Sequence, residues 1–236
     1  MYHALWRDWY LPAALPALEK LFFSQVPAKA RVLDLCCGSG HVTTELVRRG
    51  YLVTGIDSSV ELIALAKKDL QGVDLRVQDA RELHLEGPYD AAISTFDSLN
   101  HILSLDELTE VFCGVHRLLS PNGGMLVFDM NLEQAYSTDH RRWTVDLSDD
   151  SVSLIRGTYN VETKKASTEL IWFVKSPTSD VWKQHRSMVE QRCYTKTQIV
   201  SALRNASFMN VEAVAAMDAG VGADLGFGRI FFVVRR

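Results

Sequence analysis

Residues 31–50, RVLDLCCGSGHVTTELVRRG, place an apolar run, a glycine-containing turn and a helical pattern in direct succession. A buried strand that runs through a turn into a helix is the unit from which parallel sheets are built. In several enzyme classes the same unit presents backbone N–H groups at the helix N-terminus to a nucleotide. This stretch therefore favours an α/β fold with a ligand site at the glycine turn.

Strand and helix patterns alternate through the first half of the chain. Strand patterns occupy residues 31–37, 51–59, 73–80, 89–96 and 124–131. Helical patterns lie at 41–50, 60–70 and 104–120. Ser104 and Glu107 have the spacing of a capping box at the start of the last of these helices. Strands that alternate with helices in this way predict a parallel sheet covered on both faces.

After residue 140 the pattern changes to three longer strands at 151–162, 165–176 and 180–194, joined by short polar segments. Short connections favour antiparallel pairing. A helix pattern and two closing strand patterns end the chain. The sequence thus predicts a doubly wound, mostly parallel, seven-stranded Rossmann-like α/β sheet with a late antiparallel β insert. We expect the insert to lie over the C-terminal edge of the parallel strands, where ligands bind.

We expect these elements to form one domain of 236 residues with four parts. The parts are an N-terminal helical lid (1–30), a ligand-binding core (31–131), the antiparallel insert (144–194), and a C-terminal helix with closing strands (195–236).

Composition narrows the class of protein. The four cysteines form no CxxC pair and have no histidine at metal-ligand spacing, so we expect no metal site. Unpaired cysteines fit a reduced, cytoplasmic protein. No apolar run approaches the roughly 18 residues of a membrane span. The chain has a net charge of −4, whereas a nucleic-acid-binding domain usually has an excess of basic residues.

The glycine turn departs from the dinucleotide-binding pattern G-x-G-x-x-G. Gly38 and Gly40 match the first two glycines, but Thr43 stands at the third. Asp34 ends the strand just before the turn, where its charge would repel a pyrophosphate. A ligand with positive charge near the turn is favoured instead. S-adenosylmethionine, which carries an ammonium and a sulfonium group, is such a ligand.

Two further acids end the next two strands. Asp57 follows the second strand, where a carboxylate can accept hydrogen bonds from both ribose hydroxyls. Asp79 follows the third strand and could accept from an adenine amino group. Three acids at the ends of three successive parallel strands lie at one edge of the sheet. We therefore predict an S-adenosylmethionine site at that edge.

Residues 31–131 resemble the class I S-adenosylmethionine-dependent methyltransferases, whose first motif reads acid-x-G-x-G-x-G. Cys36 stands at the first glycine of that motif, as a small residue does in many relatives. With its insert, the whole chain is most similar to the glycine and amino-sugar N-methyltransferases and to uncharacterised bacterial relatives. An N-terminal tyrosine contacts the cofactor in relatives, and Tyr2 and Tyr10 both remain open for that role. The resemblance implies cofactor contacts from Asp34, Cys36, Gly38, Gly40, Asp57, Ser58, Asp79, Ala80, Ser94, Phe96, Tyr2 and Tyr10.

The segment STFDSLNHI, residues 94–102, resembles the part of small-molecule methyltransferases that passes the methionine moiety and enters the acceptor pocket. His101 is the strongest candidate catalytic residue there, followed by Asn100 and Asp97. A histidine in this place could remove a proton from a hydroxyl or ammonium acceptor. The alternative is that His101 caps the following helix or packs on it.

The leading interpretation is methyl transfer from S-adenosylmethionine to a nitrogen or oxygen of a small-molecule acceptor. An RNA-modifying methyltransferase is the alternative within enzymes, but it would need a basic acceptor face. A nicotinamide oxidoreductase is disfavoured by Asp34 and by the missing third glycine. A non-catalytic S-adenosylmethionine-binding protein would keep the same motif, because binding alone does not prove turnover.

Overall fold

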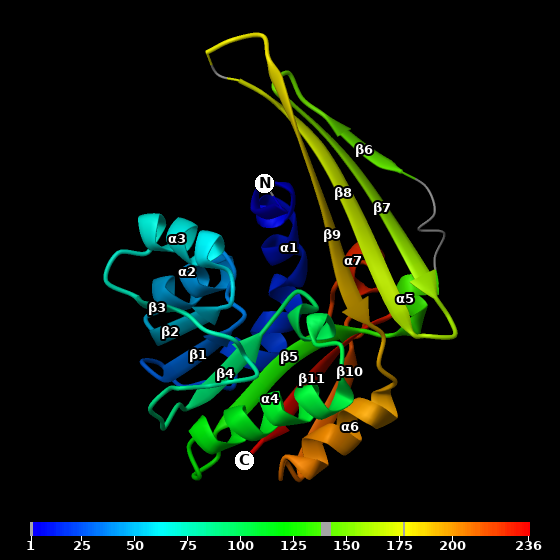
Figure 1. The fold of residues 1–236 in the computed structure, drawn as a ribbon. Coiled ribbons are helices and arrows are strands. Elements are labelled where there is room, and N and C mark those ends of the chain that lie inside the picture. The colour runs from blue at the N-terminus through cyan, green and yellow to red at the C-terminus, as the bar shows by residue number, and fades with distance from the viewer. Residues whose placement is uncertain (1, 138–142, 177) are drawn as a thin grey trace.

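The computed structural model describes residues 2–137, 143–176 and 178–236, with side chains described from residue 9 onward. The chain folds into a main sheet flanked by helices and a second, smaller sheet that rises from it (Figure 1). The helices are α1 (Tyr2–Leu18), η1 (Glu19–Phe23), α2 (His41–Arg48), α3 (Val60–Asp69), η2 (Ser98–His101), α4 (Leu105–Leu118), α5 (Glu133–Ser137), α6 (Lys196–Asn205) and α7 (Ala223–Gly226).

The main sheet has seven strands in the order β10-β11-β5-β4-β1-β2-β3. Its strands are β1 (Arg31–Leu35), β2 (Leu52–Asp57), β3 (Asp74–Val77), β4 (Ala91–Ser94), β5 (Met125–Asn131), β10 (Asn210–Ala215) and β11 (Arg229–Arg235). Strands β1 to β5 pair in parallel, whereas β11 runs antiparallel to both β5 and β10. The predicted doubly wound, mostly parallel sheet is therefore confirmed.

Both faces of the main sheet are buried, and strand alternation divides the apolar side chains between them. Leu33 of β1 belongs to the core that includes Phe112 of α4 and Leu203 of α6. Its neighbour Val32 belongs to the core formed with α1, η1 and α2, which includes Phe22. Each fully buried side chain of this size contributes about 1.5–3 kcal/mol. Among the helices that the structure describes, none is long and apolar enough to cross a bilayer.

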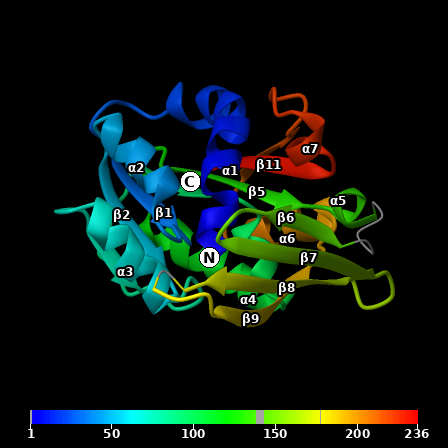
Figure 2. The same cartoon turned by 90° about the horizontal axis from the view of Figure 1, so that it is seen from above.

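The second sheet is antiparallel and contains β6 (Thr144–Leu147), β7 (Ser151–Asn160), β8 (Lys165–Lys175) and β9 (Trp182–Arg192). Seen from above, these strands lie on the opposite side of α1 from α2 and α3 (Figure 2). The C-terminal half of β9 contacts η2, the short helix that follows β4. Asn100 of η2 donates from Nδ2 to the carbonyl of Arg192 at 2.8 Å. The late insert is thus attached at the C-terminal edge of the parallel strands.

Helix starts follow local sequence in one case and not in another. Ser59 caps α3, where its hydroxyl accepts a hydrogen bond from Leu62 N at 3.2 Å. Ser104 precedes α4 without a side-chain capping bond, so the capping box expected with Glu107 is wrong. Glu107 is instead paired with Arg81, whose Nη1 lies 3.1 Å from its carboxylate. The Glu107 side chain, which the capping box required, is thus bonded to an arginine from another segment.

Candidate cofactor and acceptor site

The turn after β1 is held in left-handed backbone conformations. The φ angles of Cys36, Gly38 and Gly40 are 61°, 56° and 86°. A non-glycine residue in this region costs on the order of 1–3 kcal/mol, so Cys36 keeps the turn of the glycine motif under strain. At Gly40 a Cβ would lie 2.6 Å from Leu70 Cδ1, so no side chain fits there without movement. The backbone therefore forms the cradle that the motif predicts.

Asp57 fixes this turn to the start of α3. Its Oδ2 accepts from Gly38 N at 2.9 Å, and its Oδ1 accepts from Ser59 N at 2.9 Å. A carboxylate has about four lone-pair sites, so each oxygen retains capacity for a further donor. The carboxylate lines a cavity in front of the turn. Asp57 is thus preorganised to accept two hydroxyls.

Asp34 lies below the turn, and only 2% of it is exposed. Thr43 Oγ1 donates to its Oδ2 at 2.6 Å. Burial raises the pKa of Asp34 to about 7, and the nearby charge of Asp57 acts in the same direction. A buried carboxylate whose ionisation is disfavoured gains most from a cation brought beside it. The site therefore fits a ligand with positive charge near the turn.

The first cavity, of about 290 Å³, opens in front of the turn. Seven of the predicted cofactor residues line it: Tyr10, Asp34, Cys36, Gly38, Asp57, Ser58 and Phe96. Gly40 contributes through the conformation of the turn and is not part of the lining.

Four predicted cofactor residues lie elsewhere or are not described. Asp79 is bonded to Arg81, with Oδ2 2.6 Å from Nη2, and it does not line the first cavity. Ala80 and Ser94 are buried in the protein interior. The side chain of Tyr2 lies outside the described part of the chain. The adenine contact expected from Asp79 and Ala80 stays a prediction.

The second cavity, of about 390 Å³, lies between the main sheet and the second sheet. Phe96 and His101 line both cavities, so the two meet at the loop after β4. Side chains from the second sheet form much of its wall, including those of Ile155, Leu170, Val189 and Gln191. The strands of the insert thus border a space that adjoins the first cavity.

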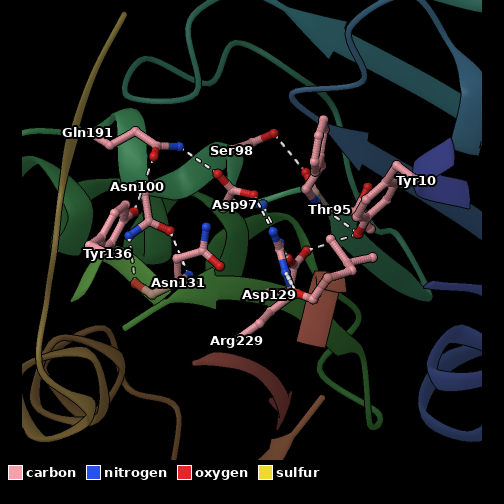
Figure 3. Close-up of polar contacts among 12 residues, drawn as sticks. Tyr10, Thr95, Asp97, Ser98, Asn100, Asp129, Asn131, Tyr136, Gln191 and Arg229 are labelled. Atoms are coloured by element: carbon pink, nitrogen blue, oxygen red, sulfur yellow. Dashed lines mark hydrogen bonds and ion pairs between the residues drawn. The ribbon is translucent and has the colours of Figure 1, made fainter. Parts of the chain in front are cut away.

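A buried ion-pair network supports the loop between the cavities (Figure 3). Arg229, at the start of β11, is 4% exposed. Its Nη2 lies 2.7 Å from Asp97 Oδ1, and its Nη1 pairs with Asp129 Oδ2. Tyr10 donates its hydroxyl to Asp129 Oδ1 at 3.3 Å and accepts from Phe96 N at 2.9 Å. The network ties α1, β5 and β11 to this loop.

The loop itself is strained where it separates the cavities. Phe96 and Asp97 have φ angles of 61° and 47°, which side-chain-bearing residues rarely adopt. Strained conformations persist where surrounding contacts over-determine them, and they gather at functional sites. Here the contacts of Tyr10 and Arg229 hold both residues.

The three predicted catalytic residues have different surroundings. Asn100 is fully buried, donates to Asn131 O at 3.1 Å and accepts from Asn131 N at 2.9 Å. It lines neither cavity, so its placement supports a structural role and not the predicted catalytic one. Asp97 lines the second cavity. His101 lies at the junction, with Nδ1 3.0 Å from Glu190 O and Nε2 3.2 Å from Gln191 Nε2.

Residues 32–123 match a protein-family model described as a methyltransferase domain. In this part the chain is similar to the S-adenosylmethionine-dependent methyltransferases. YqeM, a proposed methyltransferase of Bacillus subtilis, is 34% identical over 135 residues, which cover 56% of this chain and 51% of that protein. A proposed methyltransferase of a Geobacillus species is 28% identical over 213 residues, which cover 87% of this chain and 84% of that one. The first alignment therefore spans only about half of the relative's length.

Solved structures of methyltransferases share the whole fold. The sugar N-methyltransferase KedS8 from a Streptoalloteichus species superposes with a TM-score of 0.83 at 19% identity, over 100% of this chain and 92% of that one. CalS10, an amino pentose methyltransferase from Micromonospora echinaspora solved with S-adenosylmethionine bound, has a TM-score of 0.74 at 23% identity, over 98% and 91%. At these identities the likeness shows the fold and not the acceptor.

The residues of the first cavity fit S-adenosylmethionine. The hydrogen-bond capacity left on Asp57 suits ribose hydroxyls, and the buried carboxylate of Asp34 suits a cationic end.

Sequence reasoning missed three residues that shape the site: Asp129, Gln191 and Arg229. An isolated acid inside the apolar strand "MLVFDMN" was the available signal for Asp129. The other two stand out only once the strand order is known.

Proposed function

We propose that this protein transfers the methyl group of S-adenosylmethionine to a nitrogen or oxygen of a small molecule held in the second cavity. The observation that carries the proposal is the junction of the two cavities at Phe96 and His101. A donor in the first cavity and an acceptor in the second would meet there, shielded by the strands of the insert.

The charges of the second cavity favour neutral or cationic acceptors. Asp97 and Asp224 line it. Among the described residues of its lining, Arg229 is the only permanent cation, and both ends of its guanidinium are already bonded to Asp97 and Asp129. A carboxylate or phosphate acceptor would find no unpaired cation among these described residues and would face two carboxylates. The acceptor classes named for two structural neighbours, a sugar methylated on nitrogen and an amino pentose, fit this charge.

An RNA acceptor is less well supported. Phosphate contacts dominate nucleic-acid affinity and require clustered lysine and arginine side chains. The chain has a net charge of −4, and the described lining of the second cavity offers no free arginine or lysine.

The chemistry required of the protein is modest. S-adenosylmethionine supplies a methyl carbon already activated by its sulfonium. The chain's own residues align the acceptor, exclude water and accept a proton where the acceptor carries one. His101 Nε2 is the candidate proton acceptor, because His101 is the titratable side chain at the junction of the cavities.

The direct test of turnover is release of S-adenosylhomocysteine. The protein would be incubated with S-adenosylmethionine and three acceptor sets of similar size: hydroxylated amines, the corresponding alcohols, and the corresponding carboxylic acids. We expect product with members of the first or second set and none with the acids. Binding without turnover in every set would support a non-catalytic binding protein instead.

Removing the carboxylate of Asp57 is expected to weaken S-adenosylmethionine binding about 10- to 100-fold, because two ribose hydroxyls would lose their hydrogen-bond acceptor. The two losses together cost about 1–3 kcal/mol of binding free energy. Isothermal titration calorimetry of Asp57→Ala would measure the loss. Asp69→Ala is the matched control, since Asp69 is an exposed acid at the far end of α3. Equal affinities for Asp57→Ala and the wild type would place the ribose elsewhere.

A further inference from the structure

Gln191, at the end of β9, has an amide that is fully engaged. Its Nε2 lies 2.5 Å from Asp97 Oδ2 and 3.2 Å from His101 Nε2, while its Oε1 accepts from Tyr136 OH at 3.2 Å. An ionised carboxylate only accepts hydrogen bonds, so the nitrogen of the amide must face Asp97. That nitrogen carries two hydrogens, one for each of its partners. Figure 3 shows Gln191 beside Asp97 and Tyr136.

These contacts determine where His101 carries its proton. Nδ1 of His101 lies 3.0 Å from the carbonyl oxygen of Glu190, which can only accept, so Nδ1 bears the hydrogen. Nε2 faces an N–H of Gln191 and therefore presents a lone pair. Both contacts come from neighbouring residues of β9 and specify the same neutral tautomer. A histidine in this tautomer can accept a proton at Nε2 and at no other atom.

We propose that Gln191 is a positioning residue. It holds His101 as the Nδ1–H tautomer, with the Nε2 lone pair at the junction of the cavities, and its N–H is displaced from Nε2 when the acceptor binds there. This inference rests on the proposed function, in which His101 is the proton acceptor. When an acceptor N–H or O–H replaces the Gln191 N–H at Nε2, Gln191 keeps its bonds to Asp97 and Tyr136. Asp97 is itself anchored by Arg229. The insert therefore forms the wall of the acceptor cavity and also orients the base.

The reaction balances with this arrangement. The acceptor's proton passes to His101 Nε2, and the imidazolium keeps its Nδ1–H on the Glu190 carbonyl. The electron pair left on the acceptor nitrogen or oxygen forms the new bond to the methyl carbon. The carbon–sulfur bond breaks with its electron pair on sulfur, which leaves the neutral thioether S-adenosylhomocysteine. No oxidant, reductant or metal is needed.

Several charged or titratable groups surround His101 and set its behaviour. From β9 come Glu190 and Arg192, whose Nη1 donates to Leu103 O at 3.0 Å. Asp97 is joined to His101 through Gln191, and Arg229 lies behind Asp97. The first cavity is also lined by Tyr10, Asp34, His41 and Asp57. The partner of Nε2 among the hydrogen bonds of the described residues is the neutral Gln191 amide, not one of these charged groups.

The test uses the full chain with ¹⁵N-labelled histidine and requires no acceptor. Nitrogen NMR distinguishes the two neutral tautomers, and we expect His101 to carry its hydrogen on Nδ1. In Gln191→Glu an oxygen would replace the amide nitrogen that faces Nε2, so a larger fraction of His101 should carry a hydrogen on Nε2. Gln184→Glu is the matched control, since it adds the same charge on the exposed, distal part of β9 and should leave His101 unchanged. His185, stacked on Trp172, serves as an internal reference.

The outcomes separate this inference from the proposed function. A wild-type His101 with its hydrogen on Nε2 would overturn the inference, as would unchanged protonation of Nε2 in a folded Gln191→Glu protein. Should Gln191→Glu fail to fold, the wild-type tautomer alone decides. Calorimetry with S-adenosylmethionine accompanies each sample, and Gln191 does not line the first cavity. Absence of binding by the wild type would contradict the proposed function, whatever tautomer His101 shows.

Discussion

Replacing Asp34 with asparagine is expected to weaken S-adenosylmethionine binding strongly while stabilising the ligand-free protein at pH 8. The variant keeps the size of the side chain and an oxygen that can accept from Thr43 Oγ1. It removes the buried negative charge that a cationic ligand would meet. Loss of one partner of such a buried charge pair costs about 2–3 kcal/mol, which corresponds to about 30- to 150-fold in affinity.

The stability effect follows from the raised pKa of Asp34. The pKa of the folded carboxyl is about 7, whereas in the unfolded chain its pKa is near the ordinary value of 3.8. Between these values the folded state holds a proton that the unfolded state has released. The free energy of unfolding of the wild type therefore falls as pH rises through this window, and the loss is complete above pH 7. Asparagine does not ionise, so the variant lacks this contribution.

Urea unfolding at pH 5.5 and pH 8, with calorimetric titrations at the same pH values, would measure both effects. The stability advantage of Asp34→Asn over the wild type should be larger at pH 8 than at pH 5.5. Wild-type affinity for S-adenosylmethionine should rise toward pH 8, and that of the variant should change less. Asp69→Asn controls for loss of a surface charge. A stability difference that does not grow with pH would show that Asp34 is not held in the buried, disfavoured state described above.

Much of the fold was predictable because its signals are local. Most of the parallel strands are short apolar runs ended by glycine, serine or an acid, and the helices between them have an amphipathic period. The turn at Gly38 and Gly40 was predictable for the same reason, since left-handed backbone favours glycine. Three strands of the insert followed from long strand patterns with short connections, whereas its fourth strand, β6, was not predicted. In all these cases neighbouring residues determine the structure.

The parts of the site that were missed depend on contacts between distant residues. Arg229 lies 100 residues from Asp129 and 132 from Asp97 in the chain, and Gln191 lies 94 from Asp97. No spacing rule connects such positions before the strand order is known. Two of the predicted site residues are instead bonded to residues near them in the fold. Arg81, two residues after Asp79, engages its carboxylate, and the backbone of Asn131 engages both ends of the Asn100 amide.

Replacing Arg229 with methionine is expected to destabilise the protein by about 3–5 kcal/mol, the largest stability effect that we predict. Methionine has a similar length and keeps apolar contacts, but it leaves the carboxylates of Asp97 and Asp129 buried without their cation. Removing one partner of a buried ion pair lowers the free energy of unfolding by about this amount, because the remaining buried charge has no counter-ion. Arg48→Met is the matched control, since Arg48 is 67% exposed and pairs with Glu45 within α2. Its effect should stay below about 1 kcal/mol.

The deficit of Arg229→Met should shrink as pH falls, and this separates lost charge compensation from lost packing. Burial already raises the pKa of Asp129, with Asp97 adding to the shift and Arg229 opposing it. Without the guanidinium that pKa rises further, so the folded variant takes up a proton that the unfolded chain still releases at neutral pH. Stability relative to the wild type therefore recovers as pH decreases. Asp129→Asn in the Arg229→Met background should recover part of the loss at pH 8. Urea unfolding of the wild type, Arg229→Met and the double variant at pH 6 and pH 8 would measure this. A loss of stability that changes neither with pH nor with the second substitution would mean that Arg229 stabilises the junction by packing alone.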